Sequence, residues 1–287
     1  MRYEKPTEIE DACALLRHEA GLARVLTGGT DLLVQLKSEL VEPELIVDIK
    51  HIGGMRSIIA EEGGYRIGAA VSGAEMAEHA GLSALWPGVV EATGLIGSTQ
   101  VQGRASMAGN LCNGSPSADS VPAMFAANAI ARIHGAGGAR ECPVCEIPVG
   151  PGKTALAKDD IITSIFLPAR PKNASDAYLR FIPRTEMDIA VASAGVNLTL
   201  DATGVCTSAR VAIGAVAPTV LLVANAGEAL VGSKLDEAAL AQMVAAVEAA
   251  CNPITDKRGT IEYRTKTAGV LAKRAALIAQ ARAGGQT

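Results

Sequence analysis

The sequence predicts an α+β protein of two domains, and three observations indicate this fold class. The first 50 residues read as helix, strand, glycine turn, helix and strand, which is typical of a small α/β unit. The segment from Pro168 to Ser175 has the proline-rich, polar composition of a linker. Beyond it the pattern changes to β-branched strands followed by two long helices. A chain of 287 residues is long enough to form two modest domains with a core in each.

The N-terminal unit is predicted to begin with an amphipathic helix over residues 7–20. Thr7 is the expected N-cap, and Glu10 three residues later would complete a capping box. A short apolar strand at residues 23–26 then leads directly into the glycine turn. The remaining predicted elements of this unit are a helix over 32–39 and a parallel strand over 46–49.

The middle of the chain combines a predicted β-hairpin with a long unpatterned segment. The hairpin spans residues 57–72, with Gly63-Gly64 at its turn. Residues 95–121 are rich in Gly, Ser, Asn and Ala and show little periodicity, and such a stretch inside a domain is usually functional or disordered. The other predicted elements are helices over 74–80 and 82–94, strands over 129–134 and 161–167 with a turn at 135–138, and, in the second domain, strands over 190–200 and 210–216 and helices over 236–251 and 260–282.

Composition excludes several classes of function. The net charge is −4, aromatic residues make up only 3% of the chain and no basic tract occurs, so we expect no nucleic-acid partner. The longest uncharged stretch, Val211 to Gly227, contains Pro218 and is shorter than the roughly 20 residues of a membrane span. Acidic residues interrupt the N-terminus where a signal peptide would be apolar. We therefore expect a cytoplasmic protein whose six cysteines are reduced.

The first candidate site is the segment Val25–Leu32, which reads VLTGGTDL. A strand that enters a glycine turn and then a helix presents several main-chain N–H groups outward, and the helix N-terminus adds partial positive charge. This arrangement suits a pyrophosphate, because glycine lets the backbone approach a phosphate with no Cβ in the way. Thr30 offers an additional hydroxyl donor. The alternative interpretation is a tight turn without a ligand, since Gly-Gly turns are common.

The second candidate site is the small-residue segment from 97 to 124. It contains almost no large side chains, so its backbone can follow a ligand closely. Its polar side chains, at Asn110, Asn113, Ser115 and Asp119, can hydrogen-bond the polar atoms of a bound ligand, such as a ribityl chain or a ring. The alternative is an ordinary irregular loop.

Two further motifs have simpler explanations. Gly150–Thr154 contains GKT, but a P-loop needs a glycine where Ile147 stands, and Pro151 removes an N–H donor. Cys142 and Cys145 form a CxxC pair, yet no second pair and no histidine at ligand spacing accompanies them, which indicates reduced thiols. No nucleophile elbow, metalloprotease helix or carboxylate pair is found either. We predict no catalytic or metal-binding residues here, and a chain that binds a cofactor without such groups fits electron transfer.

These motifs, taken in order, resemble the FAD-binding medium subunit of the xanthine dehydrogenase and carbon monoxide dehydrogenase family along nearly the whole chain. The first loop of that family reads AGGTDL, where this chain has residues 27–32. Its second loop reads TIGGN and is followed by SPxxD, where this chain has residues 106–110 and 115–119. The other matching segments are GKTxL at 152–156, EMDIA at 186–190, IGAVAPT at 213–219 and DKRGTIEYR at 256–264.

The resemblance implies which positions bind FAD. In the family the first loop holds the pyrophosphate and the second runs along the flavin and ribityl chain. An aliphatic residue, here Ile162, packs near the flavin ring, and a basic residue, here Arg180, lies close to it. Ile96 stands where some relatives have an aromatic residue on the adenine. The complete implied set is Val25, Leu26, Thr27, Gly28, Gly29, Thr30, Asp31, Leu32, Ser106, Met107, Gly109, Asn110, Asp119, Ile162 and Arg180.

Three positions depart from the family pattern. Ala108 replaces a glycine of the second loop, which weakens the expectation of a close backbone approach there. Arg180 replaces a lysine and is always charged, so the potential of the flavin is expected to differ. Relatives that hold a 4Fe–4S cluster carry it in a cysteine-rich insert, whereas this chain has only Cys142 and Cys145 in that region, and we expect no cluster.

The resemblance also implies a fold and a set of partners. The fold is an FAD-binding domain of the vanillyl-alcohol-oxidase (PCMH-type) class over residues 1–170, with subdomains of about 1–55 and 56–170, plus a C-terminal α+β domain of the carbon monoxide dehydrogenase flavoprotein type over 176–287. The expected partners are a large subunit with the molybdenum cofactor and a small subunit with 2Fe–2S clusters. Electrons would then pass through FAD to NAD, a quinone or another carrier. Two alternatives are a self-contained flavin oxidoreductase on this fold and an interaction module that binds no flavin.

Overall fold

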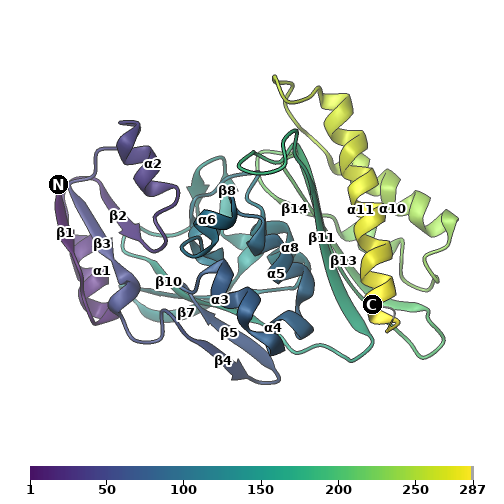
Figure 1. Ribbon diagram of the computed structural model, residues 1–287, viewed down its shortest axis with the longest axis horizontal. Coiled ribbons are helices and arrows are strands. Elements are labelled where there is room, and N and C mark those ends of the chain that lie inside the picture. Colours follow the sequence, from purple (N-terminus) through teal and green to yellow (C-terminus); the bar gives the residue numbers. More distant parts are fainter. Residues whose placement is uncertain (286–287) are drawn as a thin grey trace.

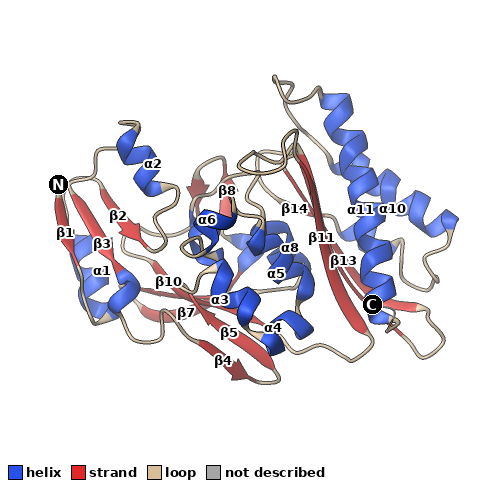
Figure 2. Ribbon diagram, viewed as in Figure 1, coloured by secondary structure: helices blue, strands red, loops and turns tan. Residues whose placement is uncertain are grey.

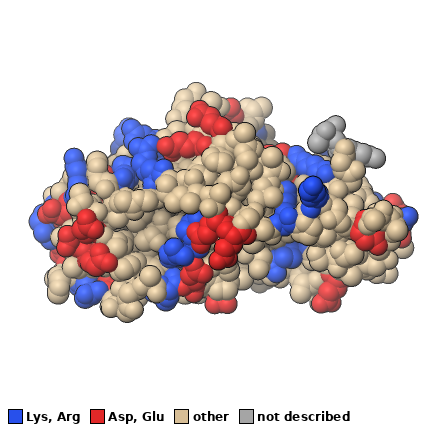
Figure 3. Space-filling model, turned by 90° about the horizontal axis from the view of Figure 1, so that it is seen from below, with Lys and Arg blue, Asp and Glu red and all other residues tan. Residues whose placement is uncertain are grey.

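The structure is a computed structural model that describes residues 1–285. It contains three larger sheets in a row, with helices between and beside them, and a small two-stranded sheet (Figure 1). The N-terminus lies at the edge of the first sheet, and the longest helix, near the end of the described residues, lies in the opposite half of the molecule. Among these residues, no helix is both long and apolar enough to cross a membrane. The face shown in Figure 3 carries acidic and basic side chains in alternating small groups.

The first sheet is a parallel three-stranded sheet in the order β1-β3-β2, as expected for the predicted α/β unit. Its central strand is buried along its whole length, and helix α1 packs against it with Ala12, Cys13 and Leu16. Strand β2 is one of the two edge strands of this sheet, and it leads directly into the glycine turn. The elements are β1 (Arg2–Glu4), α1 (Ile9–His18), β2 (Ala23–Leu26), α2 (Leu32–Lys37), β3 (Leu45–Asp48) and the 3-10 turn η1 (Ile49–His51).

The start of the first helix differs from the prediction. The N-cap is Glu8 rather than Thr7, and its side chain makes no capping hydrogen bond, so the predicted capping box is wrong. A true capping box occurs instead at α3 (Gly73–Glu78), where Ser72 and Glu75 hydrogen-bond each other's main chain.

The second sheet is antiparallel, in the order β4-β5-β10-β6-β7, and it contains the predicted hairpin (Figure 2). Six short helices belong to the same part of the chain. The strands are β4 (Ile58–Glu61), β5 (Gly64–Gly68), β6 (Ile130–Gly135), β7 (Gly138–Pro143) and β10 (Ile161–Leu167), and the helices are α3 (Gly73–Glu78), α4 (Ala80–Leu85), α5 (Pro87–Gly94), α6 (Thr99–Gln102), α7 (Met107–Cys112) and α8 (Ser120–Ala126). The 3-10 turn η2 (Val144–Glu146) and a small hairpin of β8 (Pro148–Gly150) and β9 (Lys153–Thr154) complete this part.

The C-terminal domain is an antiparallel four-stranded sheet in the order β11-β12-β13-β14. Helix α11 covers one face with a row of fully buried alanines, while α5 and α8 of the preceding part contact the other face. The first of these strands begins at Ala174, so the connection is shorter than the predicted linker, which ended at Ser175. The elements are β11 (Ala174–Phe181), β12 (Ala192–Leu200), β13 (Cys206–Gly214), β14 (Leu221–Leu222), α9 (Ala224–Glu228), α10 (Glu237–Ala250) and α11 (Ile261–Ala283).

Candidate cofactor-binding site

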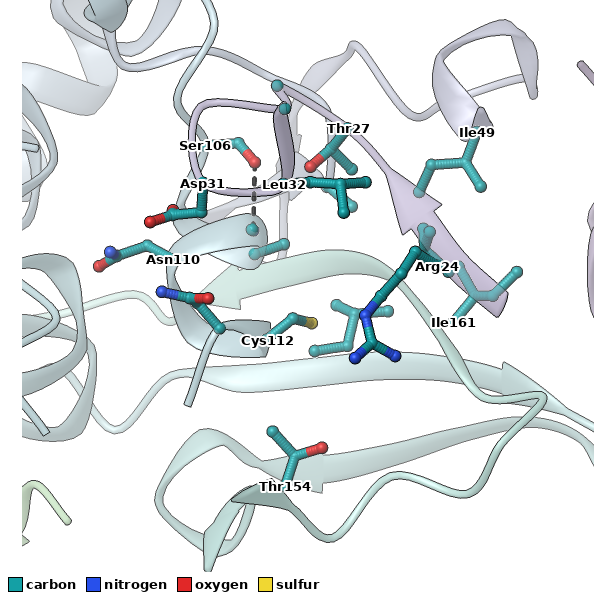
Figure 4. A pocket seen from close by; sticks show the side chains of 18 of the residues that line it. Arg24, Thr27, Asp31, Leu32, Ile49, Ser106, Asn110, Cys112, Thr154 and Ile161 are labelled. Atoms are coloured by element: carbon teal, nitrogen blue, oxygen red, sulfur yellow. Dashed lines mark hydrogen bonds between the residues drawn. The ribbon is translucent and has the colours of Figure 1, made fainter. Parts of the chain in front are cut away.

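A cavity of about 450 Å³ lies between the edge of the first sheet, helix α7 and the segment that leads into β10 (Figure 4). This volume is in the range of small-molecule sites, roughly 300–1,000 Å³. Both predicted loops contribute to its wall, although they are far apart in the sequence. The predicted residues that line it are Val25, Thr27, Gly28, Gly29, Thr30, Asp31, Leu32, Ser106, Gly109, Asn110 and Ile162.

The first loop presents a row of unsatisfied main-chain donors. Within residues 1–285, the N–H groups of the five consecutive residues from Gly28 to Leu32 have no intramolecular acceptor. The first main-chain bond after the turn is donated by Leu33 to the carbonyl of Gly29, at 2.9 Å. Main-chain N–H groups that lack a protein partner require water or a ligand. A row of them at the wall of a cavity therefore favours an anion.

The two loops are held together by direct contact between their backbones. An ideal Cβ on Gly28 would lie 1.9 Å from the carbonyl oxygen of Arg104, directly before the second loop. Gly29 has φ +76°, a left-handed conformation that glycine adopts without strain. Gly109 also faces the first loop, because a Cβ there would lie 3.1 Å from the hydroxyl oxygen of Thr27. The glycine at 28 therefore serves the contact between the loops, whereas the sequence suggested only the approach of a phosphate.

The second loop contributes further donors. Ser106 is the N-cap of α7 and accepts a hydrogen bond from the N–H of Gly109 at 3.2 Å, which is the dashed line in Figure 4. The next two N–H groups, of Met107 and Ala108, have no acceptor among residues 1–285. The side-chain oxygen of Asn110 accepts from the main chain and hydroxyl of Ser120, at 3.1 and 2.8 Å. The amide NH₂ of Asn110 therefore remains available on the cavity side.

The rest of the wall is mainly apolar. Ile96, Ile161 and Ile162 line it and are themselves almost completely buried, which suits the faces of a flat aromatic group. Cys112 points into the cavity (Figure 4), where it is an exposed free thiol.

Several cavity residues were missed by the sequence analysis. Arg24 projects its guanidinium from β2 into the cavity (Figure 4), and no carboxylate within residues 1–285 lies at ion-pair distance from it. The GKT segment forms the β8–β9 hairpin, which brings Gly152 and Thr154 to the wall, and the N–H of Gly152 donates to the carbonyl of Gly114 at 2.9 Å. Arg24 could have been found from the sequence, because it lies on the strand directly before the glycine turn. The position of the β8–β9 hairpin at the cavity follows only from the tertiary fold.

Comparison with known proteins decides the family. Residues 1–170 match the family described as "FAD binding domain in molybdopterin dehydrogenase". Residues 177–279 match the family described as "CO dehydrogenase flavoprotein C-terminal domain". This chain belongs to the FAD-binding medium subunits of the carbon monoxide and xanthine dehydrogenase family.

Relatives of this medium subunit match it along nearly its whole length. It is 36% identical over 281 residues to the carbon monoxide dehydrogenase medium chain of Afipia carboxidovorans, covering 98% of this chain and 97% of that one. It is 30% identical over 286 residues to a xanthine dehydrogenase FAD-binding subunit of Escherichia coli, covering 99% and 97%. A solved carbon monoxide dehydrogenase from Hydrogenophaga pseudoflava matches with a TM-score of 0.94 at 30% identity, with 98% of each chain covered. The predicted family and the predicted pairing of the two domain types are confirmed.

Two of the predicted residues of the medium subunit lie outside the cavity wall. Arg180 of β11 donates to the carboxylate of Asp119 at 2.8 Å, and the hydroxyl of Tyr178 donates to its other oxygen at 3.1 Å. All three side chains are buried where α8 meets the C-terminal sheet. Burial raises the pKa of Asp119, and the Arg180 guanidinium opposes this shift. Both residues are therefore paired with each other in the present structure.

The two other predicted residues that do not line the cavity are placed beside it. Leu26 is the last residue of β2, and its side chain packs against the turn. An ideal Cβ on Gly29 would lie 2.9 Å from the Cδ1 atom of Leu26. Met107 buries its side chain in the core, while its main-chain N–H belongs to the second loop. Ala108, which replaces a family glycine, is buried in α7 and lines the cavity.

Replacing Arg24 with methionine is expected to weaken FAD binding about fivefold, the equivalent of about 1 kcal/mol. The reason is loss of a cavity cation that can pair with a phosphate. The loss should shrink at high ionic strength, because salt screens a partly exposed charge. Titration of apoprotein with FAD at low and high salt measures both effects. Arg56→Met, which removes an exposed arginine outside the cavity, is the matched control, and equal affinities of Arg24→Met and wild type at low salt would contradict the prediction.

Proposed function

We propose that the medium subunit binds FAD in this cavity and passes electrons from the 2Fe–2S clusters of a partner subunit to a separate acceptor. The single observation that carries the proposal is the row of N–H groups from Gly28 to Leu32 at the cavity wall, none of which has an acceptor within residues 1–285. Ala108 adds a further N–H group of this kind from the second loop. Donors from both loops on one cavity suit the two phosphates of a dinucleotide. When bound, FAD supplies a redox centre that exchanges one or two electrons.

The residues of the chain bind and orient the cofactor in this proposal. The main-chain donors hold the pyrophosphate, and Arg24 adds a positive charge to the cavity wall. The NH₂ group of Asn110 is placed to donate to the ribityl chain or a ring carbonyl. Ile96 and Ile162 provide apolar contact and exclude water. Asp119 and Arg180, which pair with each other, stay a prediction as residues near the flavin.

The partners follow from the chemistry that this chain lacks. Among residues 1–285, no group of three or more His, Cys, Asp or Glu is arranged to hold a metal ion. The relatives are named as medium chains and FAD-binding subunits of dehydrogenases. We therefore propose a large subunit with a molybdenum cofactor, where substrate is oxidised, and a small subunit with 2Fe–2S clusters. NAD or a quinone is the proposed class of final acceptor.

Purification of the full chain with its partners tests the proposal. The complex is expected to contain one FAD per copy of this chain, 2Fe–2S absorption and molybdenum, and apoprotein of this chain alone is expected to bind FAD. Addition of the substrate of the complex should bleach the flavin absorption only when all subunits are present. A colourless chain that takes up no FAD would contradict the proposal. Turnover of an organic substrate by this chain alone would favour the self-contained oxidoreductase instead.

A further inference from the structure

Three linked side chains lie next to the first loop, and none of them lines the cavity. The hydroxyl of Tyr3, on β1, donates to the carboxylate of Asp48 at 2.5 Å. The other oxygen of Asp48 lies 2.7 Å from the ammonium of Lys50. That ammonium in turn donates to the main-chain carbonyl of Thr27 at 3.0 Å. The Tyr3–Asp48–Lys50 chain therefore links the far edge of the first sheet to the peptide that opens the glycine turn.

The position of the Thr27 carbonyl determines where the next N–H group points. A peptide bond is planar and trans, so the carbonyl of Thr27 and the N–H of Gly28 point in opposite directions. Thr27 and Gly28 line the cavity, whereas Lys50 does not. Holding the carbonyl on the Lys50 side thus aims the first free N–H of the row into the cavity. Without a partner, this peptide can rotate, and the first donor is lost from the row.

The charge state of Asp48 supports a strong link. Its side chain is only 3% exposed, and burial alone would raise its pKa. The hydrogen bonds from Lys50 and Tyr3 outweigh burial and hold the pKa below its ordinary value. Asp48 therefore stays ionised at neutral pH, and hydrogen bonds that involve an ionised partner are stronger than neutral ones. The carboxylate holds the Lys50 ammonium in place, and a further N–H group of the ammonium remains to donate to the carbonyl of Thr27.

We propose that Lys50, held by Asp48 and Tyr3, is a positioning residue that orients the first loop for the pyrophosphate. It touches neither the cavity nor a ligand in it. The inference rests on the proposed binding of FAD in this cavity. It predicts a defect that is specific for ligands with a pyrophosphate, because only they use the row of N–H groups.

The test compares three ligands on apoprotein of the full chain: FAD, ADP and riboflavin, of which only riboflavin has no phosphate. Lys50→Met is expected to weaken FAD and ADP about tenfold, the equivalent of about 1.4 kcal/mol, and to leave riboflavin unchanged. Lys50→Arg, which retains a donor and a positive charge, is expected to recover most of the affinity. Tyr3→Phe removes only a hydroxyl from a half-exposed side chain and is expected to weaken FAD about twofold to threefold. It keeps the test available if Lys50→Met does not fold.

A double substitution shows whether Tyr3 and Lys50 affect FAD affinity through one linked set of hydrogen bonds or independently. If Tyr3 acts through Lys50, adding Tyr3→Phe to Lys50→Met should cause almost no further loss of FAD affinity. Unchanged FAD affinity in Lys50→Met, or an equal loss for riboflavin and FAD, would overturn the inference. Failure of the wild-type apoprotein to bind FAD would overturn the proposed function instead, so the two failures are distinguishable.

Discussion

Replacing Gly28 with alanine is expected to reduce FAD affinity at least about 100-fold, the equivalent of about 2.8 kcal/mol. The added methyl group would lie 1.9 Å from the carbonyl oxygen of Arg104 and 2.6 Å from its carbonyl carbon. Both clashing atoms are main chain and cannot rotate away, so the two loops must separate. Overpacking of this kind costs about 1–3 kcal/mol, and here the cost falls on the spacing between the two sets of N–H donors. Flavin content after purification and titration of apoprotein with FAD measure the loss.

Gly103→Ala is the matched control for this substitution. Gly103 lies in the same segment, next to Arg104, has a right-handed conformation with φ −68° and has no atom within 4 Å of its ideal Cβ. The same chemical change there should leave FAD affinity unchanged. The C-terminal domain should remain folded in both variants, because its core is a separate cluster. If Gly28→Ala retained the flavin content of the wild type, the close contact between the two loops would not be required for FAD binding.

The glycine turn was predictable because its signal is local. Strand, turn and helix follow one another within Ala23–Lys37, and each has its own sequence pattern. The partner of Gly28, the carbonyl of Arg104, is 76 positions further along the chain, since 104 minus 28 is 76. No pattern in the first loop points to that contact. Sequence reasoning therefore located the turn correctly but gave only part of the reason for its first glycine.

The missed strands show where hydrophobic periodicity fails. The first five residues of β11 (Ala174–Phe181) are all buried, because α5 contacts one face of this sheet and α11 the other. Alternation of polar and apolar residues is lost in a strand with two covered faces. The predicted linker, which ended at Ser175, overlapped the first two residues of β11, and the buried Asp176 follows directly. Strand β7 (Gly138–Pro143) was missed for the opposite reason, since it is an edge strand with three consecutive exposed residues.

The segment 95–121 illustrates the same limit for helices. It contains α6 (Thr99–Gln102) and α7 (Met107–Cys112), which are too short to show a helical period. Its polar side chains were singled out as candidates from residue type, but their roles depend on pairing. Asn110 keeps a free NH₂ group at the cavity, whereas Asp119 is paired with Arg180. Residue type alone does not separate these two cases.

The junction between the FAD-binding part and the C-terminal domain contains a buried ion pair that connects three elements. Asp176 of β11 accepts from Arg170 at 2.8 Å and from the N–H of Val89, in α5, at 2.9 Å. The guanidinium of Arg170 lies over the ring of Trp86, 4.4 Å from its centroid. The side chains of Arg170 and Asp176 are 7% and 3% exposed. The charge of each is therefore compensated mainly by the other.

Asp176→Ala is expected to lower the free energy of unfolding by about 3–5 kcal/mol, the range for removal of one partner of a buried pair. The cause is the arginine that remains charged, buried and without its carboxylate. Chemical denaturation followed by circular dichroism measures the change. Lys273→Gln, which breaks an exposed pair with Glu237, is the control and is expected to cost less than about 1 kcal/mol.

The double variant Asp176→Ala with Arg170→Met distinguishes an uncompensated charge from lost packing. Methionine keeps much of the apolar contact of the arginine stem with Trp86 but carries no charge. If the charge is the cause, the double variant should recover a large part of the stability that Asp176→Ala loses, because replacing both partners of a buried pair is often close to neutral. If the double variant is as unstable as the single one, the junction depends instead on the hydrogen bond from Val89 and on the volume of Asp176. The second result would mean that the two domains are joined by shape and main-chain bonding, and that the ion pair contributes little to holding them together.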